Sequence, residues 1–291
     1  MHSSDEQRAM NLREAHRERV ARNEVRVSPL WTQPCRAYNV QIELDARTKS
    51  SLGATQQWLK QAEPNLLTCP EKTLHVSVAW LVAVHASYTV PKDSLWERHA
   101  EQWTMELTRI ATQSTGFRIT YEHVVATDSA VIALARPAEP VNRIRRMIRE
   151  RLRLPSETRN EADLVHTTLF RYSGRLSNPE TFLAMLEDMS VEAAAEVDEL
   201  VVSRELVYPS LEAEVSSRAF RWLPGKRTNT LCRCGQGSRA TALQRRRVDR
   251  RTERFASKKI ALPPAVSTVY RGLAGCFTRS GSGAGGRHLW V

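Results

Sequence analysis

Apolar and polar residues alternate in the segment AYNVQIELD, residues 37–45. Because successive side chains of a strand point to opposite faces, this period of two predicts a strand with one buried face. Strand-forming segments recur along the chain, at residues 73–84, 117–127, 130–136, 163–172, 197–209 and 215–223. A chain with this many strand signals is expected to fold around β-sheets.

Helical patterns stand between the strands, at residues 46–61, 91–112, 141–152 and 179–189. In the third of them, Val141, Ile144, Ile148 and Leu152 fall on one helical face, which is the spacing of a helix packed on a sheet. The sequence therefore predicts an α+β fold with helices packed on sheet.

Charge divides the chain into three parts. The net charge is +11, but residues 226–291 alone carry 15 Lys and Arg against two acidic residues. This segment is rich in Gly, Ser and Arg without a sustained period, so we expect a mostly disordered basic tail that could bind nucleic acid non-specifically. Residues 1–34 predict a charged N-terminal extension with a marginal helix outside the core. Residues 35–225 then form the predicted folded domain.

Several classes of protein fit the sequence poorly. The longest largely apolar run, residues 76–84, is too short to span a bilayer, and we expect no secretory leader and a cytoplasmic location. The five cysteines are scattered, and the pair Cys232 and Cys234 lacks the further ligands of a zinc site. No phosphate-binding glycine loop is found. We therefore expect no metal, no cofactor and no membrane contact.

Two strand segments each carry a histidine followed by a hydroxyl two residues later. LHVSV places His75 and Ser77 on one face of a strand, and VHTTL does the same for His166 and Thr168. On a regular strand, the opposite face of the first segment would hold Leu74, Val76, Val78 and Trp80. If the two strands are neighbours, two imidazoles and two hydroxyls line one site.

Each histidine has a simpler interpretation as a satisfied core residue, and it is the matched pair that favours an active site. His2 and His85 show the same short pattern. His2 lies at the chain end, while His85 falls where its strand should stop. The six arginines of residues 143–153 are interpreted as a solvated helix face, with RNA contact as the alternative.

HVSVAWL and HTTLFR resemble the paired motifs of the two-histidine phosphoesterase superfamily, which contains bacterial 2′-5′ RNA ligases and RNA 2′,3′-cyclic phosphodiesterases. The resemblance covers residues 35–225, and it extends to Trp80 and Leu81 after the first motif and Arg171 after the second. Ser77 replaces the commoner threonine, and Thr167 stands where an apolar residue is usual. The resemblance implies a two-lobed fold in which antiparallel sheets line a central groove and helices pack outside.

The resemblance also implies roles for the matching residues. His75 and His166 are the expected acid and base, since imidazole titrates near neutrality. Ser77 and Thr168 are expected to bind the substrate phosphate, where charge builds up in the transition state. Tyr172 shares the parity of His166 and is a possible substrate contact. Arg171 has the opposite parity, so it reaches the site only if a bulge re-aims it.

The expected substrate is RNA or a small nucleotide with a 2′,3′-cyclic phosphate or a 2′-5′ linkage, cleaved without metal by a monomer. The reverse, ligating direction stays open, as does a cyclic oligonucleotide or another small cyclic phosphate as substrate. A nucleotide- or RNA-binding module that uses the same groove without turnover is the alternative outside enzymes.

Overall fold

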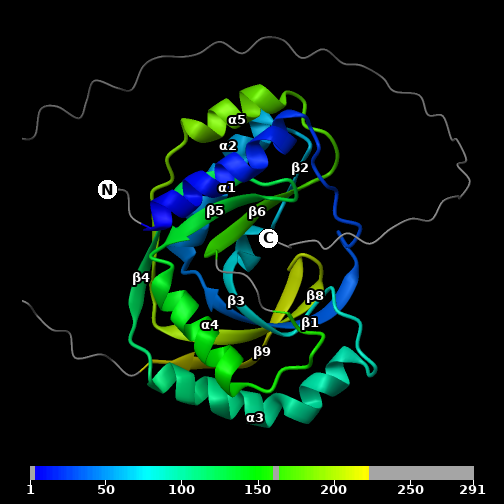
Figure 1. Ribbon diagram of the computed structural model, residues 1–291, viewed down its shortest axis with the longest axis vertical. Helices are drawn as coiled ribbons and strands as arrows, with labels where there is room; N and C mark the ends of the chain where they lie inside the picture. The colour runs from blue at the N-terminus through cyan, green and yellow to red at the C-terminus, as the bar shows by residue number, and fades with distance from the viewer. Residues whose placement is uncertain (1–3, 160–163, 223–291) are drawn as a thin grey trace, which may run out of the picture. The chain divides into compact units, whose positions relative to one another are not determined.

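The computed structural model describes residues 4–159 and 164–222. The described chain forms two antiparallel sheets with helices packed against them (Figure 1). The first sheet has the strand order β3-β1-β8-β9, formed by β1 (Pro34–Glu43), β3 (His75–Val82), β8 (Glu199–Val207) and β9 (Glu212–Arg221). The predicted α+β class with antiparallel sheets is confirmed.

The second sheet has the strand order β2-β6-β5-β4-β7. Its strands are β2 (Leu66–Thr68), β4 (Phe117–Ala126), β5 (Val131–Arg136), β6 (His166–Tyr172) and β7 (Ala193–Val197). Strands β2 and β7 were not predicted, and for β7 the reason is that AAAEV has weak strand propensity. Both are edge strands whose pairing is set by tertiary contacts.

The helices cross between the two halves of the fold. Helix α2 (Ala46–Ala62) follows β1 of the first sheet but packs on β2, β6 and β7 of the second. Helix α4 (Glu139–Arg151) follows β5 of the second sheet but packs on β3 of the first, beside α3 (Lys92–Thr112). Helix α5 (Pro179–Glu187) contacts β4. A short 3₁₀ turn, Glu71–Thr73, precedes β3.

Each sheet has a face in the main hydrophobic core and an opposite face, here called the inner face, which carries the histidine motif. The main core joins Tyr38, Val40 and Ile42 of β1 to Trp103 and Leu107 of α3. Tyr38 stacks on Trp96 of α3 with ring centroids 4.6 Å apart. The predicted buried face of the helix at 141–152 is confirmed, since Val141, Ile144, Ile148 and Leu152 are all buried.

A β-bulge interrupts each histidine strand at the same place. In β3, Gln41 pairs with Ser77 and Val40 with Ala79, so Val78 is an extra residue. In β6, Ile132 pairs with Thr168 and Val131 with Phe170, so Leu169 is extra. A bulge reverses the alternation of the residues that follow it. Residues beyond each bulge therefore face the opposite way from the sequence prediction.

Helix α1 (Ser4–Ala21) corrects the prediction that the N-terminal extension lies outside the core. Val20 is fully buried in the main core, and Leu12 packs against the cluster of Val125, Ala130 and Ile132 on the second sheet. The helix is only weakly amphipathic, which is why the sequence pattern missed its docking.

Ion pairs hold α1 in place. The Asp128 carboxylate, only 4% exposed, accepts hydrogen bonds from Arg19 at 2.9 Å and from Arg26 at 2.8 Å, and His16 Nδ1 lies 3.6 Å from it. Asp128 lies in the turn between β4 and β5. Docking by a buried charge of this kind has no periodic signature in the sequence.

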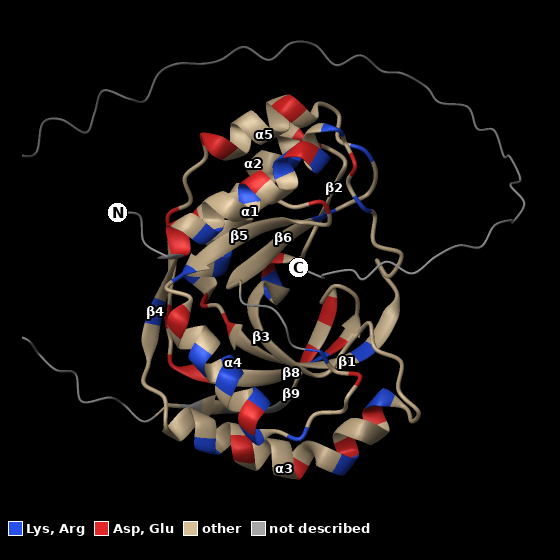
Figure 2. Ribbon diagram, viewed as in Figure 1, with Lys and Arg blue, Asp and Glu red and all other residues tan. Residues whose placement is uncertain are grey.

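Basic and acidic residues are interspersed along the surface helices α1, α3 and α4 (Figure 2). Within the two described ranges, no helix has the length and apolar character needed to cross a membrane. The predicted basic tail, residues 226–291, lies outside the described residues, and so do Cys232 and Cys234.

Candidate active site

The structure brings the two histidine strands together. Strands β3 and β6 approach each other directly, although His75 and His166 are far apart in the sequence. Both histidines are half-buried, so solvent reaches them. The charge of a protonated His75 lowers the pKa of His166, so the two rings are close enough to influence each other. Ser77 and Thr168 are likewise half-buried on the same inner faces.

Hydrogen bonds fix the orientation of His75. Its Nδ1 lies 2.8 Å from the carbonyl oxygen of Thr73, which can only accept, so Nδ1 carries the proton of the neutral ring. Its Nε2 is then an acceptor, and Ser77 Oγ donates to it at 3.1 Å. Asn39 Nδ2 donates to Ser77 Oγ at 3.0 Å. The chain Asn39–Ser77–His75 thus leaves His75 Nε2 without a proton.

His166 is held differently. The carbonyl of Leu164, two residues earlier, raises its pKa, but His166 Nδ1 makes no hydrogen bond of normal geometry to any described residue. The Leu164 carbonyl instead accepts from Arg145 at 3.0 Å.

Burial and cations keep both rings neutral. Desolvation lowers the pKa of His75, and the nearby Lys49 ammonium lowers it further, against the opposing effect of the Thr73 carbonyl. Desolvation followed by the positive charges of Arg145, Arg171 and His75 lowers the pKa of His166 to about 3. The site is a positive, partly desolvated environment, which favours an anionic ligand.

Arg145 joins the two half-sites and was missed as a site residue. It was interpreted as part of a solvated arginine face, but it is only 4% exposed. Its Nη2 donates to the carbonyls of Ser77 at 2.8 Å and Leu164 at 3.0 Å, and its Nε donates to Val78 at 3.0 Å. Its place on the buried stripe, next to Val141, Ile144 and Ile148, was the signal that could have identified it.

The bulge after Thr168 turns Arg171 toward the inner face. Arg171 Nη1 donates to the Ser129 carbonyl at 3.2 Å, and its guanidinium lies 5.8 Å from the centroid of the Tyr208 ring. Its Nε is buried and has no hydrogen-bond partner among the described residues. Arg171 is thus the cation that the bulge brings near His166.

The same bulge overturns the prediction for Tyr172. Tyr172 is fully buried, and its hydroxyl donates to the Thr127 carbonyl at 2.8 Å, so the predicted substrate contact is wrong. The prediction for Trp80, which placed it on the face opposite to His75 and Ser77, is also wrong. Trp80 pairs with Asn39, which bonds Ser77, so Trp80 lies on the inner face and is half-buried there.

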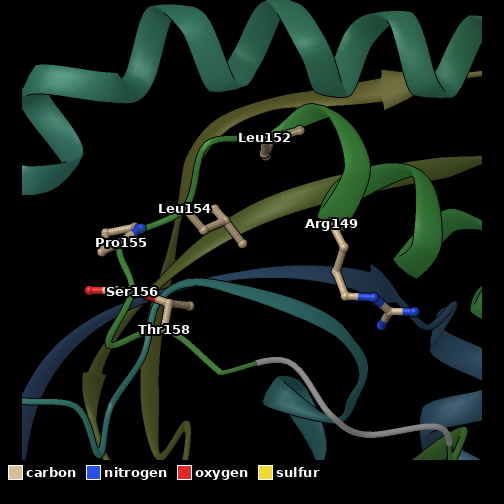
Figure 3. A pocket seen from close by; sticks show the side chains of 6 residues that line it. All are labelled: Arg149, Leu152, Leu154, Pro155, Ser156 and Thr158. Carbon is tan, nitrogen blue, oxygen red and sulfur yellow. The ribbon is translucent and has the colours of Figure 1, made fainter.

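Two further candidates are not part of the histidine pair itself. His85 follows the end of β3, is exposed, and packs edge-on against Tyr208 with centroids 5.4 Å apart. A depression of about 350 Å³ at the end of α4 is shown in Figure 3. It is lined by Arg149, Leu152, Leu154, Pro155, Ser156 and Thr158, and by neither histidine motif. In the part of the chain that the structure describes, His, Cys, Asp and Glu form no cluster of three or more that could hold a metal ion.

Comparisons with known proteins give similarity of structure but not of sequence. No protein-family profile and no curated protein sequence matches this chain. Among solved structures, TT0787 of Thermus thermophilus is 16% identical, covering 64% of this chain and 98% of its own, with a TM-score of 0.48. LigT of E. coli, crystallised with NADP⁺, is 14% identical, covering 65% and 99%, with a TM-score of 0.44. A phosphoesterase structure is also 14% identical, covering 64% and 98%, with a TM-score of 0.44. The chemistry of the site has to be read from its own residues.

Proposed function

We propose that this protein is a phosphodiesterase that cleaves 2′,3′-cyclic phosphates or 2′-5′ linkages of RNA or small nucleotides by two-histidine acid–base catalysis. The observation that carries the proposal is the meeting of two neutral, solvent-accessible imidazoles from separate sheets, each with a hydroxyl on the same face. The resemblance of both motifs to the two-histidine phosphoesterases supports the same chemistry.

The geometry suits displacement at phosphorus. A base takes the proton of the attacking water as its oxygen bonds to phosphorus. An acid gives a proton to the ribose oxygen as its bond to phosphorus breaks. The unprotonated Nε2 of His75 suits the base for hydrolysis, and the ligating reaction would exchange the two roles. Ser77 and Thr168 donate to the non-bridging oxygens, whose charge grows in the transition state.

The surrounding cations complete the site. Arg145, Arg171 and Lys49 lower the histidine pKa values in the free protein, and an arriving phosphate anion opposes this effect. Substrate binding would thereby raise the pKa of the acid histidine, which would then take its proton from solvent. RNA or a small nucleotide is the proposed ligand, and the basic tail is proposed to add contacts to longer RNA.

The test is to incubate the protein with nucleoside 2′,3′-cyclic phosphates and 2′-5′-linked dinucleotides in EDTA and to identify the products. We expect turnover that is lost in His75→Ala and His166→Ala, with circular dichroism unchanged. His85→Ala is the matched control, and it should retain activity because His85 lies outside the pair. Ligand binding with no product after long incubation would instead indicate a nucleotide-binding module.

A further inference from the structure

Each of the two bulges leaves the backbone carbonyl of its extra residue outside the regular pairing of the strand. Val78 lies three residues after His75, and Leu169 lies three residues after His166. An extra residue drops out of the regular ladder on the bulged side, so its backbone carbonyl is open to a donor from outside that strand pair. The Leu169 carbonyl also accepts from the Cys69 N–H at 3.0 Å, on the side of β2. Each bulge also decides which side chain follows the motif on the inner face, Trp80 in one strand and Arg171 in the other.

A buried polar side chain from a helix meets each of these carbonyls. Arg145 of α4 donates to the Val78 carbonyl through Nε at 3.0 Å. Gln56 of α2 donates to the Leu169 carbonyl through Nε2 at 2.8 Å, and to the Cys69 carbonyl at 2.8 Å. Arg145 is 4% exposed and Gln56 is 3% exposed. Both contacts are therefore shielded from water, where hydrogen bonds to the backbone are costly to lose.

The two contacts are reciprocal. Gln56 lies on the helix that follows β1, the partner of β3, yet it holds the bulge of β6. Arg145 lies on the helix that follows β5, the partner of β6, yet it holds the bulge of β3. The helix that follows a strand of one sheet thus contributes one polar side chain to the histidine strand of the other sheet.

We propose that Gln56 and Arg145 are a matched pair of positioning residues, each of which holds the bulge that sets the inner face of one histidine strand. Arg145 has the additional task of fixing the spacing of the strands, since one of its nitrogens joins the Ser77 and Leu164 carbonyls. The kinetic consequences rest on the proposed function, but the structural consequences do not.

The two residues differ in charge, and this difference separates their effects. Arg145 is a cation near His166, whereas Gln56 is neutral and acts on His166 only through the position of Arg171. In Gln56→Met the Leu169 bulge loses its side-chain donor, so Arg171 should turn away from His166. The pKa of His166 should then rise although no charge has been removed, because Arg171 and Arg145 both oppose its protonation. A residue that only stabilises the core would not move this pKa.

The experiment measures histidine pKa values by NMR in the substrate-free protein, together with kcat and KM for a 2′,3′-cyclic nucleotide. In Gln56→Met and Arg145→Met we expect a raised pKa of His166 and a loss of kcat of about 100-fold, the cost of a misplacement of about 1 Å. Arg145→Lys keeps the charge and the aliphatic stem, so it should lose kcat with a smaller change in that pKa. Gln57→Met and Arg146→Met, exposed neighbours on the same helices, are the controls and should behave as wild type.

The inference would be overturned by a folded Gln56→Met variant with wild-type kcat and an unchanged pKa of His166. If Arg145→Met does not fold, Arg145→Lys decides the question for Arg145 through kcat and the NMR titration. If the wild-type protein turns over no nucleotide, the proposed function fails. The NMR titration of Gln56→Met still tests the positioning role in that case.

Discussion

The hydrogen-bonded chain Asn39–Ser77–His75 predicts that substitutions of Asn39 and Ser77 have coupled effects on kcat. Asn39 Nδ2 donates to Ser77 Oγ at 3.0 Å, and Ser77 Oγ donates to His75 Nε2 at 3.1 Å. Under the proposed function, binding of a phosphate requires the Ser77 hydroxyl to turn from His75 to a phosphoryl oxygen. Asn39 keeps the oxygen of that hydroxyl in place during the turn, and His75 Nε2 becomes free to accept a proton.

The magnitudes follow from the two hydrogen bonds. Ser77→Ala removes a donor to the developing charge, which costs about 10²–10³ in kcat, or about 2.7–4 kcal/mol. Asn39→Leu removes a net contribution of about 1 kcal/mol, which corresponds to about a fivefold loss. Asn39 is 2% exposed and its Oδ1 has no hydrogen-bond partner among the described residues, so the leucine removes only the Nδ2 contact with the half-buried Ser77 and folding should survive.

The assay is a double-mutant cycle on kcat with a 2′,3′-cyclic nucleotide as substrate. Because Asn39 acts through Ser77, the double variant should be no slower than Ser77→Ala alone. Ser203→Ala is the control, since Ser203 is as buried and lies opposite Asn39 but bonds only the Glu214 carbonyl among the contacts described. A fivefold loss from Asn39→Leu in both backgrounds would refute the relay, because independent effects multiply.

Three further predictions concern pH, the N-terminal helix and the tail. The pKa values of both histidines are lowered, so the form of the pair that carries one proton is most populated below pH 6.5. In a pH–rate profile, kcat/KM should therefore be highest below pH 6.5 and should fall as pH rises above it. A maximum of kcat/KM above pH 7 would contradict this prediction. Asp128→Asn should destabilise the protein by about 1 to 2 kcal/mol in urea unfolding, since two charge-assisted hydrogen bonds to partly exposed arginines weaken. Desolvation opposes ionisation of Asp128, but hydrogen bonds with Arg26 and Arg19 outweigh it and lower the pKa of the carboxyl group. The difference in free energy of unfolding between wild type and Asp128→Asn should therefore be complete above about pH 4 and should vanish as pH falls through the folded-state pKa. A difference that persists in acid would exclude the carboxylate as its source. Removal of residues 226–291 should weaken RNA binding at low salt and flatten its salt dependence in a fluorescence-anisotropy titration, and an unchanged slope would argue against a role for the tail.

The sequence predicted the elements with a strong period and missed those fixed by single contacts. Helices α2, α3 and α4 begin and end close to the predicted residues, because apolar spacing defines their buried faces. The pairing of His75 with His166 followed from motif and parity. Parity failed beyond the bulges, since one extra residue has no compositional signature, and Tyr172 and Trp80 were therefore assigned to the wrong faces. Arg145 was missed because a buried arginine among surface arginines is identified only by its backbone partners.

The two bulges also bear on how these strands tolerate changes in length. Because each bulge adds one residue, odd- and even-numbered residues exchange faces where the strand passes through it. Deleting Leu169 would remove the bulge and leave a regular strand in which Thr168 and Arg171 keep the inner face and Tyr172 stays in the core. Deleting Val78 would likewise leave Ser77 and Trp80 on the inner face. The bulge residue is therefore the position at which each strand can lose one codon without exchanging the side chains that line the site.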